Sequence, residues 1–266
     1  MNKIFQPKRF GAYLLYDLRS AWNNYGITML ILGTLPLLVF VLNTLTELLL
    51  QGKTFQVDTS YAALLFGLAL FILVVSFSAK TYGGITDKRY GSSWLLLPAS
   101  TFEKFLSMLI VTCVVAPLCL CVLFGVTDTL MSLVFPNAYG PNIINNYDLQ
   151  AAIDESIGVH INFPALLYVS FAVPMLAFTL GAVLFKKAKP AKTFLVILAF
   201  GFVLSIIAVA FASSGILDSN NMERYLDSLT EDQMQRMINT WLNVPNLILS
   251  VLLMCGLYFR LKTIKH

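Results

Sequence analysis

Six long apolar runs divide this chain of 266 residues and constrain its fold more than any other feature. A helix needs roughly 20 mostly apolar residues to cross the hydrocarbon core of a bilayer. The runs that reach this length lie at about 27–50, 61–79, 104–127, 164–185, 193–212 and 241–259. The whole chain is 58% hydrophobic and 12% charged, whereas soluble domains average about 25% charged residues. We therefore predict an integral membrane protein.

The same runs predict the fold class. Strands of a membrane β-barrel are about 10 residues long and alternate apolar with polar residues, unlike the continuous apolar run from Leu64 to Val75. Lipid offers the backbone no hydrogen-bonding partners, so each run should satisfy its own polar groups as a helix. We expect one all-α domain over residues 1–266, a polytopic membrane protein with six transmembrane helices.

The distribution of positive charge predicts orientation. Lys and Arg gather before the first run, in the second-to-third and fourth-to-fifth connections, and after the last run. Only Lys53, Arg224 and Arg236 of the 18 lie elsewhere. Positively charged flanks stay in the cytoplasm, so we expect both termini there. The net charge of +4 then reflects how the chain is oriented in the lipid membrane. It gives no reason to expect nucleic-acid binding.

Residues 1–26, ahead of the first run, have a helical pattern of their own. Their apolar side chains recur at Phe10, Leu14, Leu18, Ala21, Trp22 and Tyr25. This spacing predicts an interfacial helix along the cytoplasmic surface, with Trp and Tyr at headgroup depth. The alternative is a simple anchor whose basic residues only set the topology.

The connection at 213–240 has two sequences typical of capping boxes, at Asn220–Glu223 and at Thr230–Gln233. Apolar residues follow each of them at helical spacing. We predict two short amphipathic helices here, leading into the last span.

The residues give no sign of an enzyme. The chain has no phosphate-binding loop of the GxxxxGK[ST] type, no CxxC pair and no HExxH motif. We therefore expect no catalytic, cofactor-binding or metal site. No ionisable residue lies at the centre of a predicted span, which disfavours an ion-coupled carrier.

Three prolines, Pro36, Pro117 and Pro174, fall near the middle of predicted spans. Each lacks a backbone N–H and can kink its helix. Such kinks suit a bundle that opens and closes, although they can also be packing features.

The stretch TDKRYGSSWLLLPASTFEKF, residues 86–105, is polar and aromatic between two apolar runs. Gly83 and Gly84 should end the preceding helix, Pro98 should stop a short turn, and Ser100-x-x-Glu103 is typical of a capping box that starts the next span. Aromatic anchors dominate many interfaces, so Tyr90, Trp94 and Leu97 are candidate docking contacts. The alternative is a re-entry whose aromatic residues only lie among lipid headgroups. The candidate set in the loop at 80–103 is Asp87, Lys88, Arg89, Tyr90, Trp94, Leu97, Pro98 and Glu103.

The residues Thr86–Arg89, Leu96–Ser100 and Glu103–Phe105 resemble the inner loop of permease subunits of the ATP-binding-cassette (ABC) type-2 exporter family, particularly those of Bacteroidetes. The resemblance implies a multi-pass protein of the bacterial inner membrane, coupled through this loop to a separate ATPase. It also implies pairing with a second copy or a sister permease. The family's substrates vary, so none is implied. The competing reading is a non-transport membrane protein, such as a scaffold, sensor or immunity factor.

The charge pattern makes a testable prediction about topology. In a background without the four native cysteines, a cysteine at Asn146 or Ser219 should react with impermeant thiol reagents in intact cells. A cysteine at Ser92 should not react. Labelling at Ser92 without labelling at the other two positions would contradict the orientation.

Overall fold

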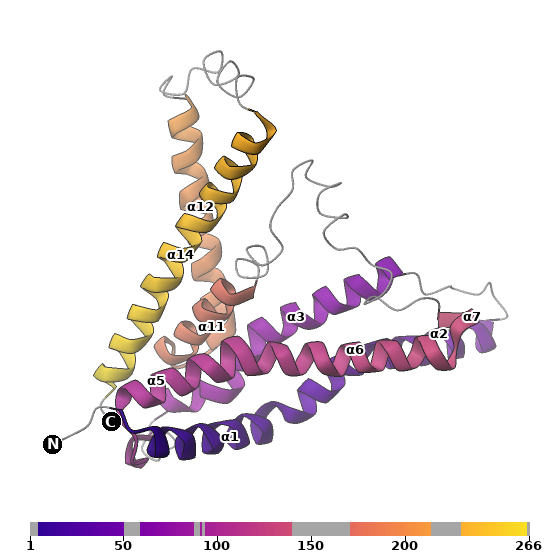
Figure 1. The fold of residues 1–266 in the computed structure, drawn as a ribbon, viewed down its shortest axis with the longest axis horizontal. Coiled ribbons are helices and arrows are strands. Elements are labelled where there is room, and N and C mark those ends of the chain that lie inside the picture. The colour runs from indigo at the N-terminus through magenta and orange to yellow at the C-terminus, as the bar shows by residue number, and fades with distance from the viewer. Residues whose placement is uncertain are drawn as a thin grey trace.

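A computed structural model describes the chain except for residues 1–4, 51–58, 88–90, 92–93, 140–170, 214–229 and 265–266. The described part is helical and contains no strand, which confirms the all-α class. Its elements are α1 (Pro7–Gly33), α2 (Leu35–Leu50), α3 (Thr59–Tyr82), the 3₁₀ turn η1 (Gly83–Thr86), α5 (Thr101–Ile110), the π turn η2 (Val111–Val115), α6 (Ala116–Val134), α7 (Pro136–Tyr139), α11 (Val173–Leu184), α12 (Lys189–Ser213) and α14 (Glu231–Thr263) (Figure 1).

Among the described residues, four helical segments are long and apolar enough to cross a membrane: Leu64–Thr86, Thr101–Val134, Lys189–Ile207 and Asn239–Thr263. The pair Pro7–Gly33 and Leu35–Thr46 makes a fifth if its two bent halves count as one span. These coincide with five of the six predicted spans. The remaining prediction, 164–185, is described only in part and contains the short apolar helix α11. Length and hydropathy therefore support an integral membrane protein, with four or five candidate spans in the part of the chain that the structure describes.

The structure moves the boundary between the N-terminal helix and the first predicted span. We expected a change near residue 26, but α1 continues to Gly33 and the chain bends by 49° between α1 and α2. The cause is Pro36, which has no N–H for the carbonyl of Leu32, one turn earlier. Thr34 closes the end of α1 by donating its N–H to the Leu30 carbonyl at 2.9 Å. The predicted kink at Pro36 is therefore confirmed.

The other two prolines have a milder effect than predicted. Pro117 lies in the first turn of α6, directly after the π turn η2, and Pro174 follows a π turn at residues 171–172. A π turn adds a residue to the helix and so accommodates a missing N–H without breaking the chain. Thr101–Val134 consequently remains one span of 34 residues, without a bend above 40°.

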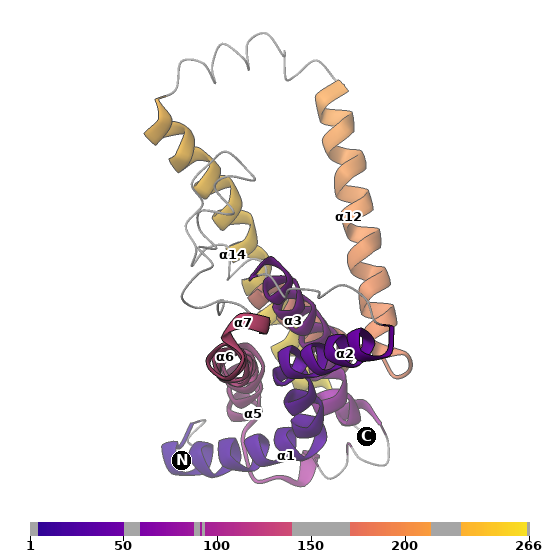
Figure 2. The ribbon, with the colours of Figure 1, turned by 90° about the vertical axis from the view of Figure 1, so that its right-hand side faces the viewer.

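The core lies where α1, α3, α5, α11 and the inner part of α14 meet. Leu73, Met108, Met175 and Leu257 are fully buried there. By contrast, the outer parts of α12 and α14 rise away from the other helices (Figure 2). Between residues 194 and 207, every side chain of α12 is exposed and most are apolar. A helix that is apolar on all sides belongs in lipid or in protein.

The connection before the last span is simpler than predicted. α14 starts at Glu231 with the expected capping box, in which the N–H of Thr230 donates to Oε1 of Gln233 at 3.1 Å. The helix then runs without interruption to Thr263. The predicted second amphipathic helix is thus the first part of α14 and not a separate element. The other helix, after Asn220, lies outside the described residues.

A glycine contact between α11 and α12 tests this packing. A Cβ at Gly181 would lie 2.7 Å from Cγ2 of Thr193, closer than atoms tolerate, whereas a Cβ at Gly201 would meet nothing within 4 Å. We expect Gly181→Ala to cost about 1–3 kcal/mol of stability. Gly201→Ala should be neutral or stabilising, because alanine favours helices. Thermal unfolding in detergent measures both, and equal effects would contradict the close approach.

Candidate functional site

Segments that the charge pattern places on one side of the membrane meet at one end of the molecule. They are the start of α1, the stretch from η1 to the start of α5, the connection between α11 and α12, and the end of α14 (Figure 1). We call this region the inner junction. Contacts tie it together: Thr86 Oγ1 donates to the Phe185 carbonyl at 3.4 Å, and Arg260 Nε to the Val183 carbonyl at 3.4 Å. The shared location agrees with the predicted topology.

Helix length is compatible with a junction that lies beside the membrane. A helix of 34 residues, such as Thr101–Val134, is about 51 Å long, whereas the hydrocarbon core is about 30 Å thick. The first turns of α5 can therefore project beyond the hydrocarbon, where charged groups keep access to water. The inner junction is built on these turns.

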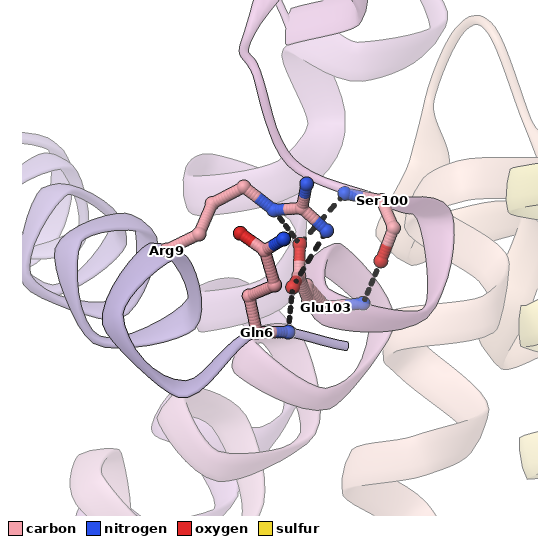
Figure 3. Close-up of polar contacts among 4 residues, drawn as sticks. All are labelled: Gln6, Arg9, Ser100 and Glu103. Atoms are coloured by element: carbon pink, nitrogen blue, oxygen red, sulfur yellow. Dashed lines mark hydrogen bonds and ion pairs between the residues drawn. The ribbon is translucent and has the colours of Figure 1, made fainter. Parts of the chain in front are cut away.

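Glu103 is the centre of the inner junction (Figure 3). Its side chain is completely buried, and its two oxygens accept four hydrogen bonds. Oε2 accepts from Arg9 Nε at 2.8 Å and from the Ser100 N–H at 2.8 Å. Oε1 accepts from Arg9 Nη2 at 2.9 Å and from the Gln6 N–H at 2.9 Å. The predicted capping box is confirmed, and the same carboxylate also fastens the start of α1 to the start of α5.

The loop ahead of Glu103 is held by Lys104. Lys104 Nζ donates to the Trp94 carbonyl at 2.7 Å and lies 4.5 Å from the centroid of the Trp94 ring, a cation–π contact. Trp94 also packs against the hydrophobic core and is half-buried. Trp94 therefore braces the loop from within. From the sequence we had instead expected it to project from the loop as a docking contact.

The exposed apolar residues of the loop are its other leucines. Leu96 is 83% exposed and Leu95 40% exposed, whereas Leu97 is half-buried and Pro98 is exposed. The sequence prediction chose Leu97 from this group. It had no means of ranking three consecutive leucines, because their exposure depends on how Trp94 is held.

The polar start of the loop is tied to the first residue of α12. Lys189 Nζ lies 3.9 Å from Oδ1 of Asp87 and donates to the Gly83 carbonyl. A Cβ at Gly83 would come within 3.3 Å of this ammonium group, so the glycine also leaves space for Lys189. Lys88, Arg89 and Tyr90 lie outside the described residues.

Sequence reasoning missed Asp17. This buried carboxylate accepts from Tyr82 Oη at 3.0 Å and from Ser107 Oγ at 2.6 Å, and so joins α1, α3 and α5. The signal was the i, i+4 series Tyr13, Asp17, Ala21, Tyr25 and Met29, all of which are buried. The predicted apolar face of this helix is therefore rotated: Trp22, assigned to it, is 55% exposed.

The groups at the inner junction hold segments together. Glu103 links α5 to the start of α1, and Asp17 links α1 to α3 and α5. Within the described residues, no group of three or more His, Cys, Asp or Glu could hold a metal ion. The arrangement fixes the positions of these helices relative to one another.

The Arg9–Glu103 pair leads to an asymmetric prediction. Arg9→Gln leaves a buried carboxylate without its cation, which is strongly destabilising. Glu103→Gln retains a residue that capping boxes accept and leaves Arg9, whose side chain is 33% exposed, within reach of water. We expect Arg9→Gln to lower the midpoint of thermal unfolding more than Glu103→Gln.

The double variant should unfold at a higher temperature than Arg9→Gln alone, because the unpaired charge is gone. Lys8→Gln, an exposed neighbour, is the control and should change little. The coupling of these two side chains would be contradicted if both single variants lowered the unfolding midpoint equally and the double variant lowered it by the sum of the two.

Comparison of the chain with protein-family models, with curated proteins and with solved structures found no match. The resemblance to ABC exporter permeases therefore rests on the short motifs at Thr86–Arg89, Leu96–Ser100 and Glu103–Phe105.

Proposed function

We propose that this protein is the permease subunit of an ATP-driven, ABC-type exporter in a bacterial inner membrane. The inner junction is the docking surface for a separate ATPase. The permease pairs with a second copy or a sister permease, as the resemblance implies. The chain supplies the membrane pathway, and the partner hydrolyses ATP.

The observation that carries this proposal is the pair of exposed leucines, Leu95 and Leu96, on a loop anchored on both sides. Asp87 approaches Lys189 before them, and Lys104 and Glu103 hold the chain after them. Apolar side chains that project from an anchored loop are suited to bind a partner, because little conformational freedom is lost on binding.

The connections of the loop support coupling as well as docking. The loop leads directly into the helix Thr101–Val134. Glu103 fastens this helix to α1, and Asp17 fastens α1 to α3 and α5. A displacement at Leu96 therefore reaches three helices through buried polar contacts. The bend before Pro36 and the π turn before Pro117 are places where such helices can adjust.

The test separates the docking surface from its support. Leu96→Ser should weaken binding of the ATPase by about tenfold to hundredfold, because burying a leucine contributes about 1.5–3 kcal/mol, and should leave the unfolding temperature unchanged. Trp94→Ala should lower both the binding of the ATPase and the unfolding temperature, because Trp94 braces the loop. Lys192→Ser, at an exposed residue in the first turn of α12, is the control.

The ATPase would first be identified by co-purification from native membranes and mass spectrometry. Pull-down of that ATPase and its rate of hydrolysis in vesicles with the permease are then measured for each variant. If Leu96→Ser leaves both unchanged, this surface does not couple an ATPase. If co-purification recovers no ATPase, the scaffold, sensor or immunity reading replaces the exporter.

A further inference from the structure

An apolar groove of about 380 Å³ lies between α1 and the π turn region, away from the inner junction contacts. One wall is formed by Trp22, Gly26 and Met29 of α1, and the other by Val111, Val115 and Cys119. Phe77 of α3 also lines it. The lining is apolar apart from one charged residue, Arg19, near the N-terminal end of the α1 wall.

Arg19 is a candidate anion-binding side chain. It is exposed, and no hydrogen bond or ion pair joins it to another described residue. Arg19 and Trp22 are three residues apart, so they share a face of α1, and both line the groove. Trp favours the level of lipid headgroups, and guanidinium binds phosphate oxygens in a bidentate manner.

The length of the groove matches one leaflet. From Arg19 to Met29, α1 rises about 15 Å, which is half of the hydrocarbon thickness of about 30 Å. We propose that the groove binds an anionic phospholipid of the inner leaflet. An acyl chain lies between Trp22 and Cys119, and the phosphate lies on Arg19.

Gly26 keeps this groove open. A Cβ at Gly26 would lie 3.0 Å from Cδ2 of Trp22, so the indole ring lies along α1 over the glycine. A larger residue at position 26 would push the ring toward the opposite wall. Glycine is thus the residue that allows a broad aromatic ring and an acyl chain on the same face of the helix.

The site can be tested by fluorescence of Trp22 in the full chain carrying Trp94→Phe and Trp241→Phe. The protein is placed in phosphatidylcholine vesicles that contain a small fraction of brominated phosphatidylglycerol or brominated phosphatidylcholine. We expect half-maximal quenching at a fraction of brominated phosphatidylglycerol about fivefold lower than that of brominated phosphatidylcholine. One basic residue near the membrane surface attracts anionic lipid by about this factor. Arg19→Gln should abolish this preference, whereas Lys262→Gln, which removes an exposed cation of α14, should retain it.

A second variant tests the apolar part of the site. Cys119→Phe fills the groove and should weaken quenching by low fractions of phosphatidylglycerol, with Arg19 still present. Equal quenching by the two lipids in the parent protein would overturn the proposal. So would a preference that persists in Arg19→Gln, because the anion would then be bound elsewhere.

Discussion

The Glu103 carboxylate is the interaction on which the inner part of the structure depends. A buried carboxylate is tolerated only when its oxygens are fully hydrogen-bonded and its charge is balanced. Here two backbone N–H groups and the Arg9 guanidinium meet both requirements. The donors come from the end of the loop and from the start of α1, and Glu103 itself belongs to α5. One side chain therefore sets the relative position of all three.

Polar contacts of this kind recur along α1. Asp17 joins it to Tyr82 and Ser107, and Tyr25 Oη lies 2.6 Å from Ser76 Oγ on α3. Farther along, Thr127 Oγ1 donates to the Gly33 carbonyl at 2.7 Å. Lipid is as apolar as the side chains of the helices, so apolar burial does not hold such helices together as it does in water. Hydrogen bonds and close packing at small residues do so instead.

Much of the fold could be predicted because the bilayer restricts it. The apolar runs identified five segments that the structure contains as helices of spanning length or as a bent pair. The capping box of Ser100 and Glu103 predicted the start of α5, and that of Thr230 and Gln233 predicted the start of α14. Both could be recognised in the sequence because a capping box needs only local geometry. Pro36 predicted a bend for the same reason: the loss of an N–H acts within one turn.

The site was predicted less well. The loop at 80–103 was identified from its composition, but Trp94 lies inward and Leu96 outward. That difference depends on Lys104, which sits ten residues later in the chain and contacts both the ring and the carbonyl of Trp94. The partner of Glu103 is 94 residues away, at Arg9. No local pattern indicates such a pair.

The sequence by itself determined that this chain is helical and apolar enough to span a membrane, and where several of its helices begin or bend. These properties follow from hydropathy and from hydrogen bonds within one turn. Only the tertiary structure decided which face of α1 is buried, which loop residues project, and which charges meet. Those outcomes depend on helices distant in the sequence, because a buried carboxylate such as Asp17 or Glu103 is stable only beside donors that other helices supply.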